Sequence, residues 1–369
     1  MDAPLKLVGV EGSPYSRKMR AVLRYRHIPF RWVYQHTPAA AALPTPKVPV
    51  IPVIAFPEPD GTYERVMTDS SPQIMVLEQM FPGRSVVPVD PVVEFLDYLI
   101  EDYADEWVTK MMYHYRWHHP GGIDKAGKLL PIQGTSVVAD DQWAKQTAWI
   151  TDRQIERRAL VGSTDDNLPV IEESYVRLLH LLDDLFAERE FVMGDRPGRS
   201  DFGLFGQLTQ LCWWDPEAVE VAVREAPRVV AWVGRTEDLS WVEPSDDGWI
   251  DRDIAVASLQ PLLAEIGATY APFMLANHEA FRVDDDTVRC EIHGRPYTQA
   301  LFRYQRKCLD WLRDHYAAQA DADRDAIDAA GRHRLRGPVR ATVALFGHWT
   351  CPYVNRVDFA LGQRGSPTS

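Results

Sequence analysis

The sequence predicts an α/β domain over residues 1–88, followed by an all-α domain over residues 89–250. Two observations lead to this fold class. In the first ninety residues, short apolar runs and helical patterns alternate in the order β-α-β and then β-β-α. From Asp90 onward, apolar residues recur at helical spacing instead, for example between Phe95 and Trp107. We therefore expect a sheet-containing domain first and a helical domain after it.

The composition limits the class of partner. A chain of 369 residues with 46% hydrophobic and 25% charged residues is expected to form two or three globular domains. Its net charge of −13 argues against nucleic acid or an anionic membrane as partner, because both require a basic face. We expect neither a signal peptide nor a membrane helix. The four cysteines form no CxxC motif, so a cytoplasmic location is expected.

The first element is an apolar run from Leu5 to Val10, which ends in a turn and continues into a helical segment. Pro14 suits the first position of that helix because no N–H is needed there, and Ser13 suits the cap. A hydroxyl would then lie beside backbone N–H groups at the positive end of the helix dipole. Such a place binds anions, and a thiolate is an anion. Taken alone, however, a Ser-Pro pair is more often only a cap.

The remaining elements of the first domain are three short strands and a helix. Apolar, β-branched runs bounded by turn residues predict the strands. A capping residue before a proline and an apolar run predicts the helix. In order, these elements are strands over residues 29–34, 47–56 and 63–67 and a helix that starts at Asp69-Ser70.

Three motifs in this domain resemble those of the thioredoxin-like domain of cytosolic glutathione transferases. The motifs are SPYSRK after the first strand, an Ile-Pro pair before the third strand, and an acidic residue followed by Ser at the last helix. The resemblance implies that the Ser13 hydroxyl, with Tyr15 as a weaker candidate, donates a hydrogen bond to the sulfur of glutathione. Ser13 would not itself be the nucleophile, because no general base is visible in its motif.

The other two motifs would bind the rest of glutathione. The resemblance implies that Ile51 and Pro52, joined by a cis peptide bond, hold the cysteinyl backbone. Pro49 remains an alternative as the cis proline, since both prolines lie in the same apolar run. Asp69 and Ser70 would hold the γ-glutamyl group; without a ligand, the same pair would serve as an ordinary helix cap.

The helical remainder extends the resemblance to roughly residues 4–245. Helical patterns cover residues 143–161, 168–186, 204–214 and 227–233. The family lines its acceptor pocket with the first long helix and with the buried helix after a capping box. For any single side chain here, an ordinary inter-helix core is the simpler interpretation. The candidate pocket residues are Tyr103, Trp107, Met111, Tyr115, Trp213 and Trp214.

The capping box departs from the family pattern. The family has Pro-Ser/Thr-x-x-Asp at the start of its buried central helix. Here Asp201 takes the acidic place, but Gly198 stands where Ser or Thr is expected. Glycine is tolerated as a cap, although the reciprocal side-chain bond would be lost.

A histidine cluster follows the first long helical run. His114 and His118 are four residues apart, a spacing that can bind a metal on a helix, and His119 is adjacent. No HExxH pattern accompanies them, so a packed aromatic face is the simpler interpretation. We therefore expect no metal.

Two further segments follow the helical domain. Residues 251–335 predict a helical extension with a β-hairpin near residues 281–297. Residues 340–369 are expected to be a partial repeat of the N-terminal strand-turn-helix, because 345–367 align without gaps on 7–29. Cys351 falls on the position of Ser13 in that alignment. The repeat is interpreted either as a remnant or as an accessible thiol at a helix start.

The resemblance implies a glutathione transferase with glutathione as co-substrate and a hydrophobic, electrophilic small molecule as acceptor, acting as a possible homodimer. Two alternatives stay open. A glutathione-dependent thiol transferase or reductase needs a cysteine for the mixed disulfide, and only Cys351 could supply it near such a motif. A binding protein without turnover would keep the fold and lose the chemistry.

Overall fold

The computed structural model of the protein describes residues 3–330. The chain divides into two compact units, one of Met1–Val89 with Asp97–Ile250 and the other of Asp90–Leu96 with Asp251–Ser369. The first unit contains the predicted α/β domain together with most of the predicted helical domain. The predicted repeat over residues 340–369, with Cys351, lies outside the described residues.

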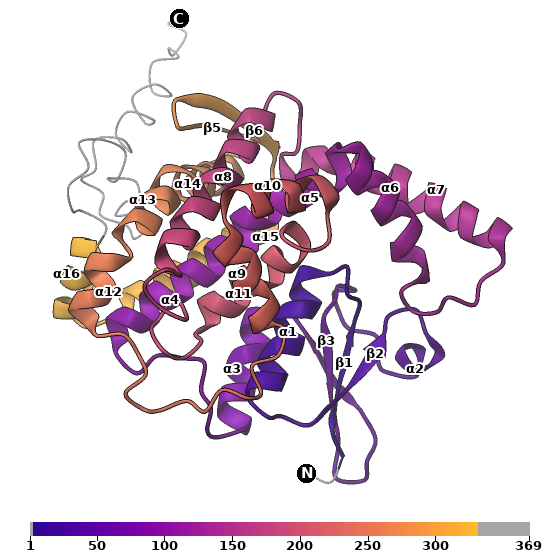
Figure 1. The fold of residues 1–369 in the computed structure, drawn as a ribbon, viewed down its shortest axis with the longest axis horizontal. Helices are drawn as coiled ribbons and strands as arrows, with labels where there is room; N and C mark the ends of the chain where they lie inside the picture. Colours follow the sequence, from indigo (N-terminus) through magenta and orange to yellow (C-terminus); the bar gives the residue numbers. More distant parts are fainter. Residues whose placement is uncertain (1–2, 331–369) are drawn as a thin grey trace, which may run out of the picture. The chain divides into compact units, whose positions relative to one another are not determined.

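The first unit begins with a four-stranded sheet in the order β2-β1-β3-β4. Strand β1 is parallel to β2 and antiparallel to β3, and β3 is antiparallel to β4. Helices α1 and α3 lie next to each other on one face of this sheet (Figure 1). This is the thioredoxin-like arrangement predicted from the sequence. The bounds are β1 Leu5–Gly9, α1 Pro14–Tyr25, β2 Phe30–Tyr34, β3 Val53–Phe56, β4 Arg65–Thr68 and α3 Ser70–Met80.

The Pro- and Ala-rich segment after β2 contains one more turn of helix, α2 (Pro38–Ala41). Thr37 caps it by accepting a hydrogen bond from the Ala40 N–H at 3.4 Å. Pro38 occupies the first helical position, so α2 starts with the same combination of hydroxyl cap and proline as α1.

Helices make up the rest of the first unit. The first long helical run contains a π-helical turn between α4 and α5, a feature that inserts one residue into the hydrogen-bond pattern. Helix α9 is buried along its whole length. The bounds are α4 Pro91–Tyr103, η1 Ala104–Val108, α5 Thr109–His118, α6 Pro120–Leu129, η2 Leu130–Ile132, α7 Asp140–Glu156, η3 Arg158–Val161, α8 Leu168–Leu185, α9 Arg199–Leu211, α10 Pro216–Glu225 and α11 Pro227–Thr236.

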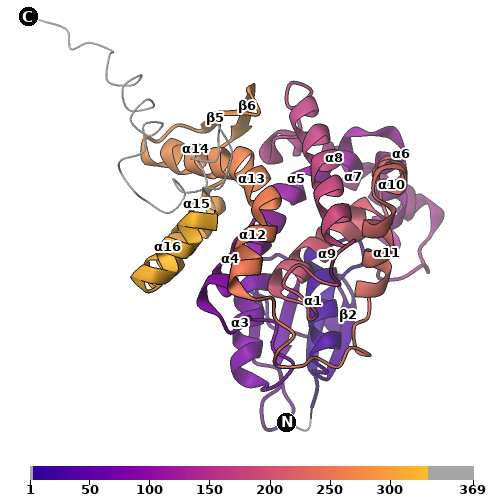
Figure 2. The ribbon, with the colours of Figure 1, turned by 60° about the vertical axis from the view of Figure 1, so that its left-hand side comes forward.

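The second unit combines helices with a two-stranded antiparallel hairpin, which lies beside α14 (Figure 2). His293 and Gly294 have positive φ angles of 48° and 75°, as a tight two-residue hairpin turn requires. Tyr297 packs its ring edge-on against Phe273 of α14. The bounds are α12 Arg252–Ser258, α13 Gln260–Ala268, α14 Tyr270–Arg282, β5 Thr287–Ile292, β6 Arg295–Ala300, α15 Arg303–Ala317 and α16 Asp321–Ala330.

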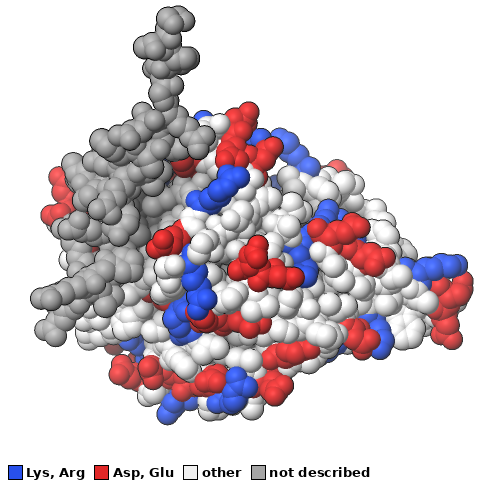
Figure 3. All heavy atoms as spheres, turned by 90° about the horizontal axis from the view of Figure 1, so that it is seen from above, with Lys and Arg blue, Asp and Glu red and all other residues white. Residues whose placement is uncertain are grey.

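Two properties bear on the predicted partners. Among residues 3–330, no single helix is long and apolar enough to cross a membrane; the bent pair Arg252–Ser258 and Gln260–Arg282 passes that test by length and composition only. Basic and acidic side chains are interspersed over the uncovered part of the face drawn in Figure 3. Mixed charge of this kind is typical of a solvated surface.

Candidate functional site

The sheet brings the three predicted glutathione motifs to one edge. Val53 of β3 pairs with Val8 of β1 on one side and with Thr68 of β4 on the other. Because both pairings are antiparallel, the end of β1, the start of β3 and the end of β4 lie at the same edge. The motif residues that follow or precede these strand ends are Ser13, Pro52 and Asp69.

Ser13 is the N-cap of α1, as the sequence predicts. Its backbone is extended, and its Oγ accepts a hydrogen bond from the N–H of Ser16 at 3.2 Å. Pro14 is the first residue of the helix. Since the hydroxyl oxygen acts as acceptor in the cap, its own proton remains available for donation to an anion. The side chain is half-buried, so an anion can approach from the edge of the sheet.

Tyr15 is directed elsewhere. Its hydroxyl donates to the carbonyl oxygen of Asp105 at 2.8 Å and lies 3.2 Å from Oγ1 of Thr109. Burial, followed by the nearby carboxylates of Asp105 and Glu106, raises the pKa of Tyr15 well above its ordinary value. The phenolic proton of Tyr15 is therefore used in the bond to the π-helical turn, and its oxygen also contacts Thr109 of α5.

The cis peptide bond joins Ile51 and Pro52, which decides between the two prolines that the sequence left open. Gln73 of α3 holds this segment in place, because its Nε2 donates to the carbonyl oxygens of Pro52 at 3.1 Å and Met67 at 2.7 Å. Gln73 thus links the start of β3 and the end of β4 to α3. This role of Gln73 could not be predicted from the sequence, because a glutamine inside a helix gives no signal of a backbone partner.

Asp69 does not cap α3 with its side chain, in contrast to the simple interpretation of its sequence. Its φ angle is 79°, in the left-handed region that non-glycine residues rarely adopt. Strained backbone of this kind concentrates at functional sites. The carboxylate of Asp69 contributes to raising the pKa of Asp105, while Ser70, the first residue of α3, is buried.

A buried ionic cluster lies where α1 and α3 meet α4 and the π-helical turn η1. Lys18 of α1 is fully buried, and its Nζ lies 2.7 Å from Oε1 of Glu101 and 2.6 Å from Oδ2 of Asp105. The hydroxyl of Ser71 donates to Glu101 at 2.9 Å. Burial opposes the charge of Lys18, but the two carboxylates outweigh it and raise its pKa. Burial, with Glu101 beside it, raises the pKa of Asp105 to about 6.

The turn before Ser13 is held by side chains from the helical part. Arg116 Nη1 donates to the carbonyl oxygen of Gly12 at 2.6 Å, and Gln210 Nε2 donates to that of Glu11 at 3.1 Å. The N–H of Gly12 donates to Oε1 of Gln133 at 3.1 Å. Three side chains far apart in the sequence therefore fix the backbone that leads into the cap. Their long sequence separation explains why the motif alone did not reveal them.

The six candidate pocket residues fall into two groups. The four on the first long helical run are at most 4% exposed, so they belong to the inter-helix core and do not line an open pocket. Packing of the π-helical turn against α9, and of α5 against α8 and α9, contributes to this burial. Trp213 is 54% exposed, and Trp214 lies under the guanidinium of Arg116. The four core residues are Tyr103, Trp107, Met111 and Tyr115.

The capping box of α9 keeps its acidic half. Asp201 Oδ2 accepts from the N–H of Gly198 at 2.9 Å, and its Oδ1 accepts from that of Val192 at 2.9 Å. Burial raises the pKa of Asp201 to about 8. The hydroxyl half is missing at Gly198, as expected from the sequence.

A carboxylate from α4 replaces the missing hydroxyl. Asp97 Oδ2 accepts from the N–H of Arg199 at 3.0 Å, and its Oδ1 accepts from the N–H and Oγ–H of Ser200 at 3.0 and 2.5 Å. A Cβ atom on Gly198 would lie 2.3 Å from Asp97 Oδ1. Glycine at this position therefore makes room for a cap that comes from another helix.

The histidines form a contact group at the end of α5. The rings of His114 and His118 are stacked, with centroids 4.5 Å apart. Burial, and then the neighbouring His118 and His119, lowers the pKa of His114 to about 3. Packing of aromatic rings was expected here, but Glu172 of α8 also joins the group.

Residues 7–85 match the family model of the glutathione S-transferase N-terminal domain. This segment is a glutathione S-transferase N-terminal domain. The match includes all three motifs at the edge of the sheet. It ends before the helical segment that follows, which the family model does not cover.

Several solved structures are similar to part of this chain. A glutathione S-transferase of Methylobacterium radiotolerans, in complex with glutathione sulfonate, is 19% identical, with a TM-score of 0.37 over 63% of this chain and 90% of that chain. The β-etherase LigF of Sphingobium is 20% identical, with a TM-score of 0.43 over 63% and 93%. A glutathione S-transferase of Rhodospirillum rubrum is 16% identical, with a TM-score of 0.41 over 68% and 98%. No curated protein matches the sequence.

Proposed function

We propose that the protein binds glutathione at the edge of the sheet and stabilises its thiolate for attack on a hydrophobic, electrophilic small molecule. The observation that carries this proposal is the register that aligns Val8, Val53 and Thr68 across three strands. It places the cap of α1, the cis Ile-Pro bond and the left-handed Asp69 at one edge. A capped helix start, a fixed backbone segment and a carboxylate there provide partners for a thiolate, a peptide group and an amine.

The chemistry assigned to Ser13 is hydrogen-bond donation. A cysteine-like thiol has a pKa of about 8.5, and donors at a helix N-terminus lower it toward neutrality. The Ser13 hydroxyl already accepts from Ser16, so it is oriented for donation of its own proton. The positive end of the α1 dipole adds to the stabilisation of the anion. The thiolate of glutathione then acts as the nucleophile.

Thiol exchange has less support in the described part of the chain. The motif position holds Ser13, and the three described cysteines lie elsewhere. Cys212 is buried, and burial raises the pKa of its thiol to about 12, which disfavours the thiolate needed for exchange. Cys351, the sequence-based candidate, lies outside the described residues.

The test combines binding with turnover in the full-length protein. Calorimetry measures glutathione affinity, ultraviolet difference spectra measure the pKa of the bound thiol, and a generic aryl halide measures conjugation. We expect Ser13→Ala to bind glutathione within a few-fold of wild type but to raise the pKa of its thiol. Conjugation should fall about 10- to 100-fold, the value of one hydrogen bond to a charged group.

Ser13→Thr is the matched control, because it keeps a hydroxyl and a capping residue. It should retain most of the conjugation rate. Unchanged conjugation in Ser13→Ala would show that the hydroxyl has no role. Glutathione binding without any turnover across several electrophiles would favour a binding protein, for which the burial of four predicted pocket residues is the supporting observation.

A further inference from the structure

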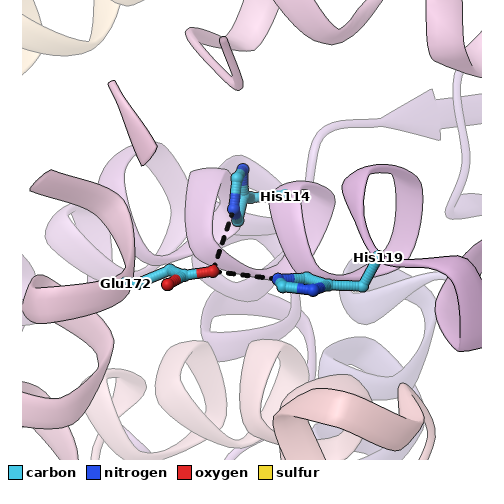
Figure 4. Close-up of side chains that lie close together, drawn as sticks. All are labelled: His114, His119 and Glu172. Atoms are coloured by element: carbon cyan, nitrogen blue, oxygen red, sulfur yellow. Dashed lines mark hydrogen bonds and ion pairs between the residues drawn. The ribbon is translucent and has the colours of Figure 1, made fainter. Parts of the chain in front are cut away.

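Two histidines and a glutamate converge at the junction of α5 and α6. His114 lies on α5, His119 lies between the two helices, and Glu172 comes from α8 (Figure 4). Nε2 of His119 is 2.9 Å from Oε1 of Glu172, and Nε2 of His114 is 3.5 Å from the same oxygen. One atom from each residue lies within 4.8 Å of the other two. Imidazole and carboxylate together are the ligand set of many zinc sites.

The buried histidine has a ring nitrogen that the protein leaves unsatisfied. His114 has 0% exposure, and its Nδ1 lies 2.9 Å from Oγ of Ser163. Its Nε2 has no hydrogen-bond partner among residues 3–330, although it faces Glu172. A buried polar atom without a partner is costly and calls for an explanation. A cation between Nε2 and the carboxylate would satisfy both atoms.

Two of the three separations between the ligand atoms suit a zinc ion, and the third is at most 4.8 Å. Ligands at about 2.0–2.1 Å in a tetrahedron are separated from one another by about 3.4 Å. The two measured separations, 2.9 and 3.5 Å, lie on either side of that value. The side chains of His119 and Glu172 are 23% and 31% exposed, so both can adjust. The same exposure gives an ion a path to the site and leaves room for water as a fourth ligand.

The chain supplies His119 rather than His118 because α5 ends at His118. Pro120 starts α6, and His119 between them has an extended backbone with ψ of 140°. This break lets the ring of His119 approach Glu172. The ring of His118 stacks on His114, and its Nδ1 instead contacts Nη2 of Arg158 at 2.5 Å. The spacing of four residues therefore leads to ring stacking between His114 and His118, while His119 is the histidine that approaches Glu172.

We propose that His114, His119 and Glu172 bind one Zn²⁺ through the two Nε2 atoms and one carboxylate oxygen. Ser163 would orient the ring of His114 from the other side, as outer-shell hydrogen bonds do in zinc sites. This inference departs from the sequence-based expectation of no metal. It is independent of glutathione binding, because no residue of the sheet edge takes part.

The experiment titrates Zn²⁺ into the chelator-treated, full-length protein by calorimetry and records the visible spectrum with Co²⁺. We expect one equivalent of Zn²⁺ and the intense bands of tetrahedral Co²⁺ without a thiolate charge-transfer band. His119→Ala and Glu172→Gln should each weaken Zn²⁺ binding at least about 100-fold, since loss of outer-shell partners alone costs 10- to 100-fold.

His180→Ala is the matched control. His180 lies on α8 like Glu172 and pairs with Glu225 at 3.0 Å on the surface, but it belongs to no described three-ligand group. The His180→Ala variant should bind Zn²⁺ with the same affinity as wild type. Glu172→Gln keeps the shape of the side chain, so circular dichroism and thermal unfolding can separate lost binding from lost folding.

Three results would overturn the proposal. Wild type could fail to bind a stoichiometric ion, or His119→Ala and Glu172→Gln could bind as tightly as wild type while folded. A cobalt spectrum with a thiolate band would assign the ion to cysteine instead.

Discussion

Helices α1 and α9 pack against each other, yet their first turns are capped in different ways. Helix α1 is capped by Ser13, the residue directly before it. Helix α9 follows Gly198, which has no side chain, and receives its cap from Asp97, 102 residues before Arg199. Both solutions satisfy N–H groups that a helix leaves unpaired at its start. Only the first can be seen in a short stretch of sequence.

The caps of α1 and α9 also differ in whether they can take part in ligand binding. The Ser13 hydroxyl has one acceptor role in its cap and keeps a proton for a ligand. The carboxylate of Asp97 is fully buried and accepts three hydrogen bonds from α9. The cap of α1 is therefore open to chemistry, whereas the cap of α9 serves stability. Substitutions at the two starts should separate these roles.

The largest effect is expected for Asp97→Ala. Removal of this carboxylate leaves the N–H of Ser200 buried without its acceptor, whereas the N–H of Arg199 keeps its bond to the carbonyl oxygen of Val86 at 3.0 Å. It also leaves the buried Arg199 guanidinium, 3.6 Å away, with one counter-charge fewer. We expect a loss of about 3 to 5 kcal/mol in the free energy of unfolding. Urea unfolding should show a lower midpoint at an unchanged slope.

The control for the Asp97→Ala prediction gives α9 a serine N-cap like that of α1. Gly198→Ser alone should destabilise, because its Cβ would lie 2.3 Å from Asp97 Oδ1. In the Asp97→Ala background this clash is gone, and the introduced serine hydroxyl could cap α9 as Ser13 caps α1. The double variant should regain about 1 kcal/mol over Asp97→Ala. A double variant less stable than either single variant would contradict the proposed exchange of caps.

The second prediction concerns the contact between the two helices. A Cβ atom on Gly206 of α9 would lie 2.7 Å from the carbonyl oxygen of Pro14. Gly206→Ala should therefore push the start of α1 away and cost about 1–3 kcal/mol, as overpacking does. Because Pro14 adjoins Ser13, glutathione affinity should fall as well. Calorimetry and urea unfolding measure the two effects.

Gly203→Ala, one turn earlier on α9, is the control. Its Cβ would approach Glu101 and Ala104 no closer than 3.3 Å, and alanine raises helix propensity by about 1 kcal/mol. We expect this variant to be near neutral in stability and unchanged in glutathione affinity. Equal effects of the two alanines would show that the contact with Pro14 has no special importance.

The contrast between the helices also explains what the sequence could predict. The order of the elements along the chain and the cap of α1 follow from local patterns. A cis proline in the segment before β3 follows from the family motif, and the structure identifies it as Pro52. For α9, helical periodicity begins only at Leu204, and the start after Gly198 is indicated by the family capping box alone. The contribution of Asp97 could not be predicted, because this residue lies on α4. Residues joined only by the fold leave no local pattern.

The same limit applies to the candidate site. Lys18 sits in the SPYSRK motif, where a lysine is ordinarily exposed, but Glu101 and Asp105 pair with it in the interior. Glu172 could not be assigned to the histidine cluster, since it lies on a helix that the sequence separates from α5. The burial of four candidate pocket residues could not be predicted either, because their place on a pocket-lining helix of the family does not show whether a side chain faces a pocket or the core.

The smallest effect on stability, and the sharpest test of the comparison, comes from two substitutions at Ser13. Both Ser13→Ala and Ser13→Gly remove the hydroxyl, but glycine is itself a tolerated N-cap. Ser13→Ala should cost about 1 kcal/mol in the free energy of unfolding and Ser13→Gly only a few tenths. Conjugation should fall equally in both, because the sulfur loses the same donor. A conjugation rate that falls in Ser13→Ala but recovers in Ser13→Gly would follow stability instead. The hydroxyl would then act only as a cap, and α1 would resemble α9 in using its cap for structure alone.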